Sequence, residues 1–173
     1  MRTSKEHQKC LKEGIVTTEM LSLAIFSCNK RAKNMRDQER EYRYHPEYRQ
    51  LYHDKKEVYY RYKDELLHQV QPCEIHIVER VRWEIDFYGE EVRRVITEKY
   101  LFYIVGDKSF HSPLLKDKEK EYKHLPIVHL DDLQTFGEDP KDLPSVQMAK
   151  KILNGLRDGS LRYVGNDPIP MAA

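Results

Sequence analysis

The fold is decided where the hydrophobic period changes, within residues 66–87, LLHQVQPCEIHIVERVRWEIDF. Before Pro72, apolar residues recur three, four or seven positions apart, which is typical of one side of a helix. After Pro72, apolar and polar residues alternate as far as Phe87, which is typical of a half-buried strand. The chain therefore joins a helical segment to a β segment, and we predict an α+β fold.

Two long helices are predicted upstream of this change. The first begins at Thr17 or Thr18, either of which can cap free N–H groups, and runs to about Arg43. The second begins at Pro46, since proline fits the first turn of a helix. We expect the first helix to bury Leu21, Ile25, Cys28, Ala32, Met35 and Tyr42. We expect the second to bury Tyr48, Leu51, Tyr52, Val58, Tyr59, Tyr62, Leu66 and Val70. The short connection predicts a long antiparallel αα-hairpin over residues 15–71.

An antiparallel sheet built on a central β-hairpin is predicted for residues 72–115. Its first part is one long strand, or two strands with a bend near residues 78–79, and should bury Cys73, Ile75, Ile77, Val81, Trp83, Ile85 and Phe87. The opposite face should expose Glu74, His76, Arg80, Arg82, Glu84 and Asp86. A turn at residues 88–91 leads to a returning strand over 92–105, and Gly106 opens a loop.

The rest of the chain completes a single domain over residues 1–173. Residues 1–14 form a loose N-terminal arm with room for a short helix, and residues 165–173 a frayed tail. Residues 116–164 hold a solvated loop, a short strand near 126–130, a C-terminal helix and an edge strand near 161–164. The helix begins near Asp142 and Pro144, ends near Gly159, and buries Val146, Ala149, Ile152, Leu153 and Leu156.

Composition narrows the class of protein. The chain has 30 Lys and Arg against 29 Asp and Glu, whereas a dedicated nucleic-acid binder is usually basic. Its three cysteines have no CxxC pair, which favours a reducing compartment over a disulfide framework. There is no apolar N-terminal signal segment and no window of 18 apolar residues. We expect a cytoplasmic protein that does not enter a membrane.

Catalytic motifs do not stand out. The sequence contains no GxxxxGKS/T, GxGxxG, GxSxG or HExxH motif, so no cofactor and no catalytic residues are predicted. Whether the protein is an enzyme stays open, with binding favoured. One enzymatic alternative is a metal-dependent nuclease, because Glu121 and Lys123 form an ExK pattern near Asp117.

One face of the first helix is basic. At 100° per residue, five cations share the arc opposite the buried stripe: Lys30, Lys33, Arg36, Arg40 and Arg43. A solvated helix face would look the same, but such an arc can also follow phosphates or an acidic protein surface.

Tyrosines and acidic residues supply further candidate contacts. Seven of the 12 tyrosines lie between Tyr42 and Tyr62, too many for one buried stripe. Tyr44 and Tyr60 are expected to be exposed, where they can pack in a protein interface or stack on bases. An acidic, turn-rich segment contains Asp131, Asp132, Glu138, Asp139 and Asp142, and could mimic phosphates.

Two stretches, NKRAKNMRD (residues 29–37) and VGDKSFHSP (residues 105–113), resemble small accessory proteins of bacterial phages and mobile elements. The resemblance implies an interaction protein, since some such proteins, including anti-CRISPR proteins, inhibit host defences. The leading hypothesis is a non-catalytic module that binds and inhibits a host protein involved in nucleic-acid handling or defence. The alternative is a nucleic-acid-binding protein that uses the basic arc. Homodimerisation is compatible with either.

Overall fold

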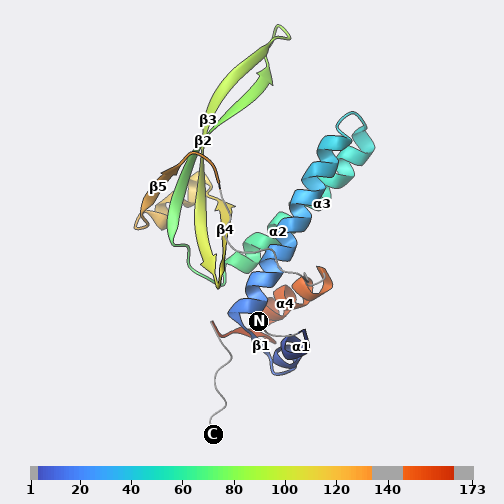
Figure 1. Cartoon of the computed structure of the whole chain (residues 1–173), viewed down its shortest axis with the longest axis vertical. Coiled ribbons are helices and arrows are strands. Elements are labelled where there is room, and N and C mark those ends of the chain that lie inside the picture. Colours follow the sequence, from blue (N-terminus) through green and yellow to red (C-terminus); the bar gives the residue numbers. More distant parts are fainter. Residues whose placement is uncertain (1–3, 134–145, 166–173) are drawn as a thin grey trace. The chain divides into compact units, whose positions relative to one another are not determined.

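The computed structural model describes residues 4–133 and 146–165. Contacts within the chain divide it into two compact units, and each is described by itself. We call residues 4–70 with 146–165 the helical unit and residues 71–133 the sheet unit. The predicted α+β class, helical hairpin and C-terminal helix are confirmed (Figure 1).

Two antiparallel helices, α2 (Thr18–Glu41) and α3 (Pro46–Leu67), dominate the helical unit. The hydroxyl of Thr17 caps α2 by accepting a hydrogen bond from the backbone N–H of Met20 at 3.3 Å. Pro46 lies in the first turn of α3, as predicted. The predicted buried stripe of α2 is confirmed in the first part of the helix. Four of the predicted residues are completely buried there: Leu21, Ile25, Cys28 and Ala32.

Shorter elements surround the start of this hairpin. The N-terminal helix α1 (Ser4–Lys12) is followed by β1 (Ile15–Val16), which pairs in parallel with β6 (Arg162–Tyr163). The C-terminal helix α4 (Val146–Asp158) ends at Gly159, whose φ of +83° favours glycine. Helix α4 buries Ala149, Ile152 and Leu153, as predicted. An ion pair between Arg157 and Glu65 joins α4 to α3.

The sheet unit contains four strands in the order β4-β3-β2-β5. Strands β2 (Glu74–Ile85) and β3 (Glu91–Val105) form the predicted β-hairpin. Strand β4 (Lys108–Pro113) pairs antiparallel with β3, and β5 (Ile127–Leu130) pairs in parallel with β2. A 3₁₀ helix, η1 (Lys116–Tyr122), connects β4 toward β5. The predicted loop after Gly106 is therefore wrong. Strand β4 was not predicted because its polar and apolar residues are buried alike: Ser109, Phe110, His111 and Ser112. An alternation of polar and apolar residues therefore does not mark this strand.

The outer half of the β2–β3 hairpin is a two-stranded ribbon. Strand β5 pairs with β2 only as far as Val78, and β4 pairs with β3 only from Tyr100 onward, so the hairpin extends beyond both (Figure 1). The predicted buried face is wrong here, because Trp83 is 66% exposed and Phe87 is 97% exposed. Alternation identifies which residues share a face, but it does not say whether anything covers that face.

The face assignment also fails at the base of β2. His76, from the face expected to be exposed, is buried, whereas Cys73, expected to be buried, is exposed. The third strand, β4, which the sequence pattern did not reveal, places His111 beside His76.

The close packing of α4 against Leu161 gives a test of the helical unit. A Cβ atom added at Gly155 would lie 2.4 Å from Cγ of Leu161. Although alanine is the better helix former by about 1 kcal/mol, we expect Gly155→Ala to lower the free energy of unfolding by about 1–3 kcal/mol through overpacking. Urea denaturation followed by circular dichroism measures the change, and Lys151→Ala on the exposed side of α4 is the control. A Gly155→Ala variant as stable as the wild type would contradict this packing.

Candidate interaction surface on the helical hairpin

The seam between α2 and α3 changes character along its length. At the start of α2 it is apolar, and the last turn of α3 contributes the buried Leu66 and Leu67. Further along, Lys33 of α2 lies near Lys63 of α3, and Glu39 lies between two basic side chains. At the turn the seam is aromatic. The hairpin is therefore held at its outer end by polar and ring contacts.

Glu39 makes the main charged contact between the two helices. Its Oε2 accepts a hydrogen bond from Nζ of Lys56 at 2.7 Å, and its Oε1 lies 3.0 Å from Nδ1 of His53. Burial raises the pKa of Glu39, but the bonds to Lys56 and His53 outweigh this effect and hold the pKa below its usual range. Glu39 is therefore ionised at neutral pH and links α2 to α3.

An aromatic cluster packs around the turn between the helices. The rings of Tyr42 and Tyr52 are stacked, with centroids 5.5 Å apart and planes at 17°. Tyr48 also lies 5.5 Å from Tyr42, and His45 meets the ring of Tyr42 edge-on at 6.1 Å. Such ring pairs add about 0.5–1.5 kcal/mol beyond the burial of area. They fix the conformation of the turn.

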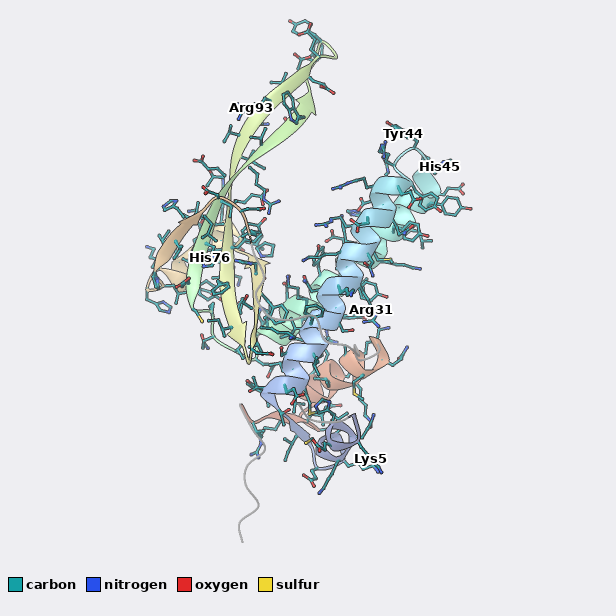
Figure 2. All side chains as sticks on the ribbon, in the orientation of Figure 1. Lys5, Arg31, Tyr44, His45, His76 and Arg93 are labelled. Carbon is teal, nitrogen blue, oxygen red and sulfur yellow. The ribbon has the colours of Figure 1, made fainter. Side chains whose placement is uncertain are left out.

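Outward from this cluster lies what we call the turn-end surface, formed by Arg40, Arg43, Tyr44, Tyr48 and Leu51. Tyr44 is 80% exposed, and Figure 2 shows it with His45 at the turn end of the hairpin. The guanidinium of Arg43 lies 4.8 Å from the Tyr44 ring centroid and donates to the backbone O of Arg40 at 3.0 Å. Tyr48 and Leu51 are exposed, so their predicted burial is wrong. The helical period assigned both residues to a stripe that is left uncovered near the turn.

The basic arc predicted from the sequence is only partly assembled on α2. Lys30, Arg36 and Arg40 are exposed on the helix, whereas Lys33 is half-buried near α3. Arg43 lies in the turn after α2 and not on the helix. Within the described part of the chain, the only carboxylate in ion-pair range of these five cations is Asp37, 3.7 Å from Arg36.

The other predicted contacts do not join this surface. Tyr60, expected to be exposed, is half-buried; burial raises its pKa, and Arg36 and Lys56 oppose that rise. Asp131 and Asp132 are exposed after β5 in the sheet unit, where Asp132 lies 3.9 Å from Arg80. The remaining acidic candidates, Glu138, Asp139 and Asp142, lie outside the described residues.

A polar cluster in the sheet unit was not predicted. Nδ1 of His76 lies 2.8 Å from Nε2 of His111, and Nε2 of His76 lies 2.7 Å from Oε2 of Glu74. The ring of His76 stacks on Phe102 at 4.4 Å (Figure 2 labels His76). Both imidazoles are buried, so the cluster joins β2 to β4 across the sheet.

A buried cysteine and the distribution of metal-ligating side chains bear on nucleophile and metal chemistry. Burial raises the pKa of the Cys28 thiol to about 11, against the lowering effect of Arg31, so this cysteine is mainly a protonated core residue. Within residues 4–133 and 146–165, no three His, Cys, Asp or Glu side chains are grouped to hold a metal ion. Glu121, part of the ExK pattern, lies 3.6 Å from Lys118.

No family model matches the chain, and comparisons with curated proteins and with solved structures gave no significant match. Among the described helices, none has the length and apolar character needed to cross a membrane. We therefore infer function from the surfaces of the chain.

The contact of Glu39 with Lys56 and His53 can be tested by removing the charge. We expect Glu39→Gln to lower the free energy of unfolding at pH 7 by about 1 kcal/mol, a partly exposed ion pair being weaker than a buried one. The pKa of Glu39 is lowered in the folded state. The carboxylate therefore contributes to the free energy of unfolding at pH values above the ordinary glutamate pKa of about 4.3, and this contribution is lost as the pH falls through the folded-state pKa. Wild type and variant should therefore converge at low pH.

Chemical denaturation from neutral to acidic pH measures this difference. The control is Glu41→Gln, which removes an exposed carboxylate from the end of the same helix and should change stability by less than about 0.5 kcal/mol. A Glu39→Gln variant that matches the wild type at pH 7 would contradict the role assigned to this contact.

Proposed function

We propose that the protein is a non-catalytic protein-binding module that docks an acidic partner on the turn-end surface. The observation that carries the proposal is the combination of exposed Tyr44, Tyr48 and Leu51 with Arg40 and Arg43 at one end of the hairpin. Tyrosine and arginine are over-represented among the residues that dominate binding energy, because they offer a large contact area with a polar or charged end.

Pre-organisation supports the same function. The stacked Tyr42 and Tyr52 rings and the contact from Glu39 to Lys56 lie directly behind the turn-end surface. A surface that is ordered before binding avoids part of the conformational entropy that association otherwise costs, about 0.5–1.5 kcal/mol for each immobilised side chain. The turn-end surface can therefore bind without first folding.

The charges indicate the chemistry of the partner. Arg40 and Arg43 have no carboxylate in ion-pair range within the described residues, so a partner would supply the acidic groups. A protein that handles nucleic acid and that the module inhibits remains our proposal for this partner, as the resemblance to phage accessory proteins implies.

Affinity capture tests the proposal. We expect a partner from a bacterial lysate, identified by mass spectrometry, to be retained by the wild type and lost with Arg43→Glu plus Tyr44→Ser, with affinity at least about tenfold weaker. The matched control, Tyr88→Ser plus Arg93→Glu, changes the same residue types at exposed positions of the ribbon (Figure 2 labels Arg93). Loss of the partner with the control variant but not with the hairpin variant would contradict the proposal.

Nucleic-acid binding is the second candidate, favoured by one observation: four exposed cations follow α2 and its turn toward Tyr44, which could stack on a base. Fluorescence anisotropy with labelled DNA and RNA, from about 50 to 300 mM salt, separates the two candidates. A protein-binding module should show no sub-micromolar binding.

The nucleic-acid candidate predicts a steep salt dependence instead. Each phosphate contact changes the logarithmic slope by about 0.9 on a duplex, so Arg36→Ala and Arg40→Ala should each reduce the slope by about that amount. Such a result would replace the protein partner by a nucleic acid.

A further inference from the structure

Lys63 is a buried cation in the seam between the two long helices. Its side chain is 7% exposed and belongs to the same buried side of α3 as Leu66 and Leu67. The closest aromatic contact is the ring of Tyr60, 5.7 Å from Nζ. Among the residues that the structure describes, no carboxylate lies in ion-pair or hydrogen-bond range of this ammonium group. A buried charge without such a partner is costly to fold.

The neighbouring charges do not neutralise Lys63. Lys33 from α2 repels it, and Asp64, the next residue in α3, attracts it. Arg36 lies near Tyr60 on the same edge of the hairpin, with Asp37 beside it. Burial is the main reason that the pKa of Lys63 is lowered to about 8; Asp64 partly opposes this effect, and Lys33 adds a smaller lowering effect. Among the described residues, the ammonium group of Lys63 therefore has no ion-pair partner, and Asp64 only partly offsets the cost of its burial.

We propose that Lys33 and Lys63 together bind a phosphate group at the edge of the α2–α3 seam. Lysine ammonium groups bind phosphate as compact point charges, and two of them on facing helices match the charge of a dianion. Lys33 is half-exposed, which gives the group access from solvent, and Lys63 lies deeper, where water screens its charge less.

This site is separate from the turn-end surface. Lys33 precedes Arg40, the residue of that surface on α2, by seven positions, which is about 10 Å along a helix. The site therefore goes beyond the proposed protein-binding function, and its test does not depend on finding a protein partner.

Phosphate binding and the protonation of Lys63 must be linked. A bound dianion favours the charged ammonium, so it raises the pKa of Lys63 from about 8 toward the usual range of lysine. By the same linkage, phosphate affinity decreases as the pH rises above about 8, because the ammonium loses its proton.

The titration of Lys63 tests the site directly. In protein labelled with ¹³C-lysine, the Cε resonance of Lys63 is assigned by its absence in Lys63→Met, and its midpoint is measured with inorganic phosphate or with sodium chloride at equal ionic strength. We expect a midpoint of about 8 in chloride and a rise of at least about one pH unit in saturating phosphate, a tenfold preference for the charged form.

Two variants keep the test specific. Lys33→Gln removes the like charge, so we expect the Lys63 midpoint to rise in chloride and the additional shift with phosphate to be lost. Lys55→Gln, an exposed lysine on α3, should leave both values as in the wild type. Lys33→Gln still tests the site if Lys63→Met does not fold.

Three results would overturn the site. The first is a Lys63 midpoint that phosphate does not move. The second is an equal shift with acetate at the same ionic strength, which would show that the pair does not select a phosphate group. The third is a shift with phosphate that survives in Lys33→Gln.

Discussion

The antiparallel packing of α2 against α3 is the interaction on which the helical unit depends. Apolar side chains hold the start of α2 to the end of α3, and α4 adds contacts at Tyr62 and Glu65 of α3. Closer to the turn, where α4 makes none of these contacts, the seam holds the two helices together. Its contacts there are those of Glu39 with Lys56 and His53, followed by the tyrosine cluster. The turn-end surface is ordered only if these polar and aromatic contacts hold.

The sequence predicts the elements better than it predicts their environment. Helical period, the Thr17 cap and Pro46 located both long helices, and the alternation of apolar and polar residues located the β2–β3 hairpin. The same alternation could not show that the ribbon around Trp83 is uncovered, since no partner strand is encoded locally. Strand β4 was missed because it is buried on both faces and includes polar residues, and the burial of His76 was missed with it.

For the candidate site, exposure was predictable but pairing was not. The exposed cations of α2 and the exposed Tyr44 follow from helix geometry and from the excess of tyrosine around the turn. The sequence pattern did not predict the buried or paired state of Glu39, Lys56 and Lys63, because charged residues on a helix are ordinarily assigned to its solvent-exposed side. Only the register of the two helices brings Glu39 to Lys56 and Lys33 to Lys63. The interior of the hairpin is therefore more polar than its sequence pattern indicates.

Amide hydrogen exchange in the first turns of α3, from Arg49, whose N–H donates to the backbone O of His45, to Lys56, tests most directly whether the seam orders the turn-end surface. We expect slow exchange in the free protein, well below the rates of an unstructured peptide, and a clear loss of protection in Tyr42→Ala, which removes the ring stacked on Tyr52. Exchange at the rates of an unstructured peptide in the wild type would contradict it, because the proposed binding surface would then not be preformed.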